Sequence, residues 1–121
     1  MTYVDGFVIA IPTKNLATYK KMATLGKKIW LKYGALDYKE CIADDMKPKG
    51  VTLTFPKLIK TKPNETVVFS FIVYKSRKHR DAVNKKVMAD PAMSPEKMKD
   101  KPMPFAMDRF SYGGFKTIVE A

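Results

Sequence analysis

Histidine occurs once in this 121-residue sequence, so His79 is the one side chain whose ordinary pKa lies near neutrality. Such a group could act as a general base or ligate a haem iron. It stands among Arg77, Lys78 and Arg80, and neighbouring cations favour the uncharged ring. Nothing else in the sequence indicates a haem pocket. The simpler interpretation is a helix-edge residue that contacts a sheet, and a catalytic His79 remains the alternative.

Cys41 is the single cysteine, which excludes an internal disulfide and argues against a cysteine-based metal site. A nucleophilic thiolate needs positive surroundings or a histidine partner, whereas Cys41 follows Lys39 and Glu40, whose charges oppose each other. Asp44 and Asp45, together with Glu40, could hold a divalent cation, but no further ligands follow at regular spacing. We therefore predict no metal site and no bound cofactor.

Asp5 is an acid in an otherwise apolar segment, and a buried carboxylate without a partner is costly. Either it lies near a strand end in water, or it pairs with a cation such as Arg109. Three aromatic residues, Trp30, Tyr33 and Tyr38, either fill a core or line a pocket between a helix and a sheet. The alternatives stay open for each of these residues.

Four strands and two helices would position these side chains. We expect strands over residues 3–11, 35–43, 66–74 and 109–120 and amphipathic helices over residues 16–33 and 77–89. The element order predicts an α+β fold of the ferredoxin-like βαββαβ type, in which two helices cover one face of a four-stranded antiparallel sheet. We expect a single domain over residues 1–121.

Local signals mark the ends of these elements. Asn15 and Ser76 are suited to cap the two helices, and Gly34 to end the first of them. A long connection spans residues 44–65, with one helical turn near its middle, and such loops are often functional. Gly113–Gly114 predicts a bulge or a close backbone approach in the last strand.

The first and third strands are apolar on both of their faces. Phe7 points opposite to Val8, and Phe69 points opposite to Val68. Two helices can cover only one face of such a sheet, and an exposed apolar face would exceed what soluble monomers usually tolerate. We therefore predict a homodimer that forms through the uncovered face.

The formal net charge of +11 could mark a nucleic-acid partner. However, 20 of the 23 basic residues are lysine, and they are spread along the chain rather than clustered. Arginine carries most bidentate recognition of bases and phosphates, so we disfavour nucleic-acid binding. No segment approaches the roughly 18 apolar residues that span a bilayer, and the N-terminus lacks the features of a signal peptide. We therefore expect no membrane association and a cytoplasmic location.

Several short segments resemble the YbaA-like bacterial proteins, a family of unknown function within the dimeric α/β-barrel superfamily. The matching segments are Tyr3–Phe7, Tyr33–Leu36, Glu40–Cys41 followed by Asp44–Asp45, Glu65–Ser70, His79–Asn84, Lys86–Pro91, Met103–Phe105 and Tyr112–Phe115. The resemblance implies the ferredoxin-like fold and the dimer, and it implies no activity. It also implies a ligand site between the first helix and the sheet, for which Asp5, Trp30, Tyr33 and Tyr38 are the candidates.

We expect a homodimer that binds a small molecule. Such a protein could be a cofactor-independent enzyme that acts on an apolar metabolite. The alternative is a non-catalytic interaction or structural module with a basic surface. Whether the protein is an enzyme stays open, because no catalytic triad, phosphate loop or dinucleotide fingerprint is present.

Overall fold

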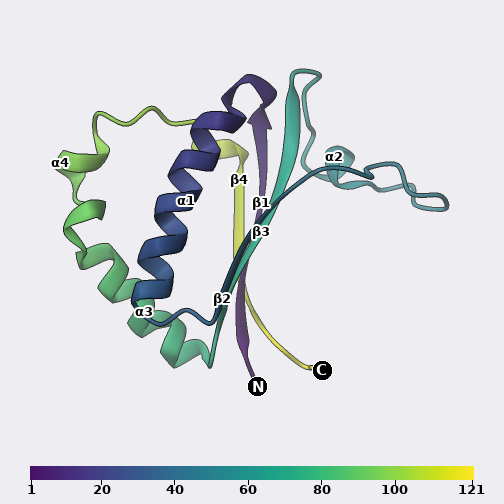
Figure 1. The fold of residues 1–121 in the computed structure, drawn as a ribbon. Helices are drawn as coiled ribbons and strands as arrows, with labels where there is room; N and C mark the ends of the chain where they lie inside the picture. The colour runs from purple at the N-terminus through teal and green to yellow at the C-terminus, as the bar shows by residue number, and fades with distance from the viewer.

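A computed structural model describes residues 1–121 as one sheet with helices packed against it. The elements are β1 (Tyr3–Pro12), α1 (Leu16–Lys32), β2 (Asp37–Ile42), α2 (Phe55–Leu58), β3 (Glu65–Tyr74), α3 (Arg77–Ala89), α4 (Pro95–Met98) and β4 (Phe110–Lys116). The strands lie in the order β2-β3-β1-β4 and all pairs are antiparallel. Figure 1 shows α1, α3 and α4 on one side of the sheet and α2 on the other. This is the predicted ferredoxin-like arrangement. None of its helices has both the length and the apolar character needed to cross a membrane.

The helix ends follow the local signals in two of three cases. Ser76 accepts a hydrogen bond from the backbone N–H of His79 and so caps α3. Gly34 follows α1 with φ of 111°, a conformation that favours glycine. The prediction for Asn15 was wrong, because its side chain makes no cap and instead donates to the carbonyl of Pro104 at 3.0 Å. That bond ties the start of α1 to the segment before β4.

Strand β4 is shorter than predicted and carries no bulge. Its register with β1 is continuous from Phe110, opposite Ile9, to Lys116, opposite Tyr3. Beyond the strand, the N–H of Thr117 still donates to the carbonyl of Thr2 at 3.2 Å. The close approach is real, since a Cβ at Gly114 would overlap the hydroxyl of Tyr3. The glycine therefore makes room for a tyrosine from the neighbouring strand.

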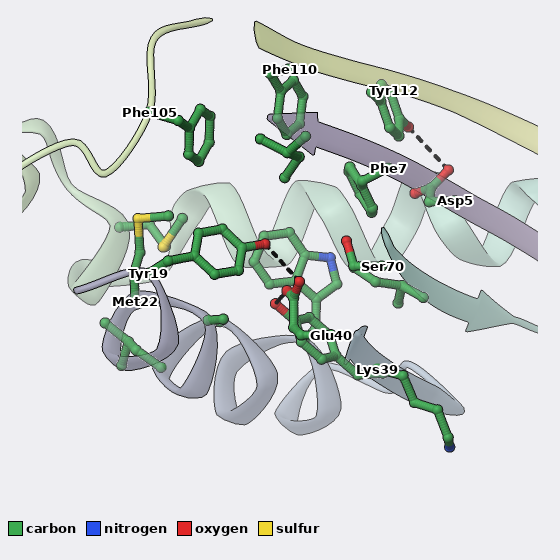
Figure 2. Close-up of a pocket in the computed structure, with 18 of the residues that line it drawn as sticks. Asp5, Phe7, Tyr19, Met22, Lys39, Glu40, Ser70, Phe105, Phe110 and Tyr112 are labelled. Atoms are coloured by element: carbon green, nitrogen blue, oxygen red, sulfur yellow. Dashed lines mark hydrogen bonds between the residues drawn. The ribbon is translucent and has the colours of Figure 1, made fainter. Parts of the chain in front are cut away.

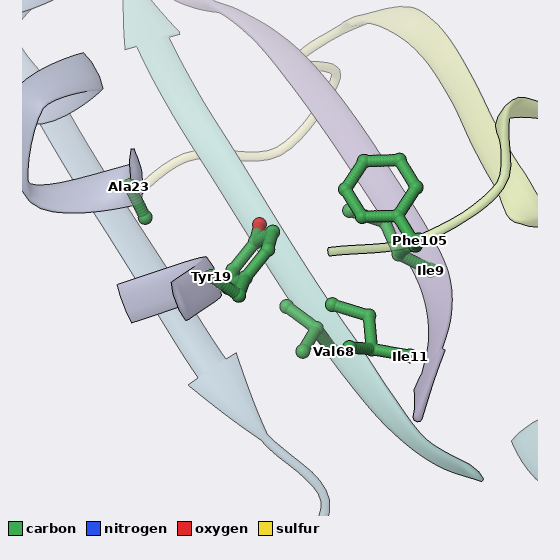
Figure 3. Packing of buried hydrophobic residues seen from close by; sticks show 6 residues of the cluster. All are labelled: Ile9, Ile11, Tyr19, Ala23, Val68 and Phe105. Carbon is green, nitrogen blue, oxygen red and sulfur yellow. The ribbon is translucent and has the colours of Figure 1, made fainter. Parts of the chain in front are cut away.

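The core lies between the helices and the sheet. Figure 3 shows one part of it, where residues of β1 and β3 meet α1 and the segment before β4; its members are Ile9, Ile11, Tyr19, Ala23, Val68 and Phe105. A second cluster surrounds Ile72 and Tyr74 of β3 and includes Val83 and Val87 of α3. Full burial of each large apolar side chain contributes about 1.5–3 kcal/mol, so these clusters hold the two helices on the sheet.

The opposite face of the sheet is partly open. The connection of residues 43–64, which contains α2, lies on this side (Figure 1), and Phe55 packs against Phe69 with ring centroids 6.3 Å apart. Phe69 is nevertheless 43% exposed and Phe115 is 62% exposed. The sheet therefore presents apolar side chains that nothing in the chain covers.

Candidate functional site

A cavity of about 440 Å³ lies between the sheet and the helices α1, α3 and α4. Of its 21 lining residues, 14 are hydrophobic, so its walls are mainly apolar. Its volume falls within the usual range for small-molecule sites, roughly 300–1,000 Å³. Figure 2 shows its polar groups approaching from the sheet and from α1. Met98 and Lys101, from α4 and the residues after it, close the side away from the sheet.

The floor of the cavity is a row of four side chains, one from each strand. Glu40 pairs with Ser70, Ser70 with Phe7, and Phe7 with Tyr112 in the strand registers. Because side chains alternate along a strand, these four residues all face the helices. The rings of Phe7 and Tyr112 stack with centroids 5.0 Å apart. Strand pairing alone therefore assembles this floor.

Asp5 forms a buried ion pair at one end of the cavity. Its Oδ1 accepts hydrogen bonds from Arg80 Nη1 at 2.8 Å and from the Tyr112 hydroxyl at 3.0 Å. Only 2% of the Asp5 side chain and 12% of the Arg80 side chain are exposed. Burial raises the pKa of the Asp5 carboxyl, while the Tyr112 hydrogen bond and the Arg80 charge counteract that rise.

The partner of Asp5 is thus Arg80, and not Arg109. Arg109 instead pairs with Glu65, with Nη2 and Oε1 2.6 Å apart. The register places Tyr3 opposite Tyr74, so the start of β1 lies beside the end of β3 and the first turn of α3. The predicted topology contained this signal, because the helix after the third strand must begin near the start of the first.

Glu40 forms a second polar centre, which we did not identify from the sequence. Its Oε1 accepts a hydrogen bond from the Tyr19 hydroxyl at 2.6 Å, and its Oε2 accepts one from the Tyr38 hydroxyl at 2.8 Å. Burial and the neighbouring carboxylate raise the pKa of both phenols, so both remain donors. A Cβ at Gly26 would lie 2.9 Å from the Tyr38 hydroxyl. The absence of a side chain at Gly26 on α1 therefore makes room for the Tyr38 hydroxyl.

Asn84 holds the aromatic wall between these two centres. Its Oδ1 accepts hydrogen bonds from Trp30 Nε1 at 3.0 Å and from the Tyr74 hydroxyl at 3.3 Å. Trp30 in turn packs near Tyr38, with ring centroids 6.4 Å apart. A single amide from α3 therefore orients a ring of α1 and a ring of β3.

Of the four predicted pocket residues, Asp5, Trp30 and Tyr38 line the cavity and Tyr33 does not. Tyr33 is the residue that ends α1, and its hydroxyl donates to Asp90 Oδ2 at 2.6 Å. Its spacing from Trp30 indicated the same helix face, but the backbone leaves helical geometry at Tyr33. The Tyr33 hydrogen bond is the largest cause that lowers the pKa of Asp90 to about 2.

The structure places His79 outside the cavity lining. Its Nδ1 accepts a hydrogen bond from the backbone N–H of Lys75 at 2.9 Å, and its ring meets the edge of Tyr74. Cys41 is exposed on β2. Nowhere do three or more histidine, cysteine, aspartate or glutamate side chains gather closely enough to hold a metal ion, so Asp44 and Asp45 gain no further ligands.

Comparisons with known proteins cover almost the entire chain. Residues 2–107 match a family described as "Protein of unknown function (DUF1428)". The uncharacterized protein YbaA of Escherichia coli strain K12 is 42% identical over 120 residues, which cover 99% of both chains. YbaA of Shigella flexneri has the same identity and coverage. These matches confirm the resemblance to YbaA-like proteins.

A solved structure supports the fold independently. A dimeric ferredoxin-like protein from an uncultured marine organism matches the whole chain over its own whole length, with a TM-score of 0.56 and 12% identity. This likeness extends to the fold alone. The sequence matches go further, because they include β1, the residues of the cavity floor and the segment around α4. These matches show that the chain belongs to DUF1428, a family of unknown function.

Proposed function

We propose that this protein is a homodimer that binds a small, mainly apolar molecule in the cavity between α1 and the sheet. The cavity itself carries the proposal, because it offers about 440 Å³ of concave space beside Phe7 and Phe110, enough for a small molecule. Apolar walls with a few convergent polar groups are the usual features of a ligand site.

A cavity-filling variant tests this proposal. Ala23 lines the cavity from α1, so Ala23→Met extends a flexible side chain into the space. Ala82→Met makes the same change on an exposed position of α3 and serves as the matched control. We expect native mass spectrometry of freshly purified protein to show a bound small molecule in the wild type and the control, and its loss in Ala23→Met.

Fluorescence of the hydrophobic dye ANS supplies a second readout. We expect Ala23→Met to bind less dye than the wild type, because the methionine side chain fills the cavity. The proposal fails if Ala23→Met retains the bound mass as well as Ala82→Met does. It also fails if no bound mass is found and Ala23→Met leaves the dye signal unchanged. Thermal denaturation of both variants checks that each remains folded.

The dimer part of the proposal is supported by the open face of the sheet. Phe115 and Phe69 are exposed there, and the structural neighbour is described as dimeric. Phe115→Lys would place a charge in the proposed interface. Met88→Lys is the control, because Met88 lies on α3 and is 60% exposed, similar to the 62% of Phe115. We expect light scattering at micromolar concentration to give twice the mass of one chain for the wild type and Met88→Lys, and a lower mass for Phe115→Lys. A monomeric wild type would contradict the dimer.

An enzyme without a cofactor is the second candidate. It is favoured by one observation, the raised pKa of the Asp5 carboxyl at the wall of an apolar cavity. A carboxyl of this kind can exchange a proton with a bound molecule. Once a bound molecule is identified, incubation with the wild type and with Asp5→Asn tests it. Conversion by the wild type alone supports catalysis, and an unchanged molecule in both supports binding only.

A further inference from the structure

Two of the polar groups around the cavity, Asp5 and Glu40, are carboxylates, and an ionised carboxylate only accepts hydrogen bonds. Glu40 and Asp5 present carboxylates from β2 and β1, which are two strand spacings or roughly 10 Å apart. Ser70 lies on β3 between them and can either donate or accept. Figure 2 shows Glu40 turned toward the Tyr19 hydroxyl inside the cavity. A ligand that offers donors would therefore match this surface.

The negative charge of Glu40 is not neutralised by any cation. Both of its hydrogen bonds come from uncharged phenols, and it takes part in no salt bridge. A second groove of about 420 Å³, between α1 and the β2 edge of the sheet, shares Glu40 with the cavity and is lined by Lys20 and Lys27. Neither lysine pairs with Glu40. Asp5 differs, because Arg80 balances its charge.

Two of the cations near the cavity, Arg80 and Lys39, are already paired with carboxylates. Arg80 directs Nη1 to Asp5 and Nε to Asp81, and its guanidinium lies over the ring of Tyr3, 4.9 Å from the centroid. Lys39 pairs with Asp37 at 3.1 Å. Only Lys101 remains, and it is exposed at the rim. The net charge of +11 therefore does not describe the inside of the cavity.

Aromatic residues flank the Glu40 carboxylate, which belongs to an exposed residue of β2. Tyr19 and Tyr38 donate to it through their hydroxyls, and Trp30 packs beside Tyr38 in the same wall. Ring faces attract cations, although the attraction is modest at exposed sites. An ammonium group beside Glu40 is therefore favoured first by the opposite charge and second by the neighbouring rings.

From this geometry we infer that the ligand is an apolar amine, whose protonated nitrogen binds Glu40 and whose hydrocarbon or aromatic body lies over Phe7 and Phe110. The inference rests on the proposed function, since it names the chemical class that the same cavity takes. It adds one specific requirement, a cationic donor at the β2 end of the floor.

Three compounds with the same ring and a two-carbon chain test the amine: 2-phenylethylamine, 2-phenylethanol and phenylacetate. Affinities come from NMR titration of the wild-type protein. We expect the amine to bind more tightly than the alcohol and the acid to bind most weakly. Glu40→Gln should weaken the amine on the order of 10- to 100-fold, the effect of losing a charged hydrogen bond, and leave the alcohol nearly unchanged.

Asp44→Asn is the matched control, because it removes an exposed carboxylate just beyond β2 that lies outside the cavity lining and forms no salt bridge. It should leave amine affinity unchanged. Equal affinity of amine and alcohol, equal loss in both variants, or no binding of the amine overturns the ligand class. Amine binding that Ala23→Met leaves intact overturns it as well, because the amine then lies outside the cavity. If the amine and the alcohol bind equally well, or if both variants lose the same affinity, continued binding of the alcohol still supports the proposed function.

Discussion

Removal of the Arg80 guanidinium tests whether the ion pair at the cavity wall is needed for folding. Arg80→Met keeps an unbranched apolar stem and leaves the Asp5 carboxylate, which is 2% exposed, without its cation. Loss of one partner from a buried ion pair costs about 3–5 kcal/mol. The Tyr112 hydroxyl still donates to Asp5, so we expect the lower end of that range. For a chain of this length the corresponding fall in Tm is about 10–15 °C.

The dependence of this loss on pH provides a sharper criterion. Burial raises the pKa of Asp5 in the folded protein above the ordinary value of 3.8, so the folded state binds this proton more readily than the unfolded chain. Stability therefore falls as the pH rises through the window from 3.8 to the raised folded pKa. Without Arg80 the folded pKa rises further, which extends the window upward. We expect the difference in Tm between wild type and Arg80→Met to narrow as the pH falls from about 8 to about 4.

Thermal denaturation followed by circular dichroism at several pH values measures both effects. The double variant Asp5→Asn with Arg80→Met removes both charges and keeps an acceptor for Tyr112. It should be more stable than Arg80→Met alone at neutral pH, because no buried charge is left unpaired. A difference in Tm that does not change with pH, or a double variant less stable than the single one, would refute the reasoning.

Two further predictions concern sites away from the ion pair. The Tyr33 hydrogen bond helps to hold the folded pKa of Asp90 at about 2, below the ordinary 3.8. The stabilisation from Asp90 is therefore present above pH 3.8 and is lost as the pH falls to 2. Urea denaturation of Asp90→Asn should show a smaller loss of stability over that interval, and the same dependence of stability on pH as in the wild type would contradict this. Gly114→Ala should cost about 1–3 kcal/mol because its Cβ meets the Tyr3 hydroxyl. Gly113→Ala, whose Cβ would lie 3.5 Å from Phe115, should cost clearly less in the same urea experiment, and equal costs would contradict the close approach.

Strand and helix positions were predictable because the signals that define them are local. The nearly continuous apolar run from Thr66 to Tyr74 is typical of a central strand, and β3 does lie between two neighbours. The cap of α3 at Ser76 depends on residues three positions apart. The end of β4 could not be predicted in this way, because it depends on pairing with β1, which is distant in sequence.

The site was less predictable, because its contacts join residues that are distant in sequence. Asp5 and Arg80 are 75 positions apart, and no local signal joins them, although the predicted topology brings the start of the first strand near the helix that follows the third. From the sequence, Glu40 was considered only as a weak metal ligand and as a neighbour of Cys41. Its hydrogen-bond partner Tyr19 lies on α1, a different element, so local sequence gave no sign of this contact. Tyr33 was misplaced for a different reason, since helical spacing holds only as far as the helix extends.

The order in which the chain is made has a consequence for the cavity. Asp5 lies on β1, the strand that is paired on both sides, and one of its partners, Tyr112, is 107 positions further along the chain. Contacts of such separation form late, because the closure of a long loop must precede them. An incomplete chain that lacks β4 therefore has neither the complete floor of the cavity nor the Tyr112 hydrogen bond to Asp5. A small molecule that binds as proposed would meet the complete cavity only after synthesis is finished, and the edge of β1 that β4 will cover stays open until then.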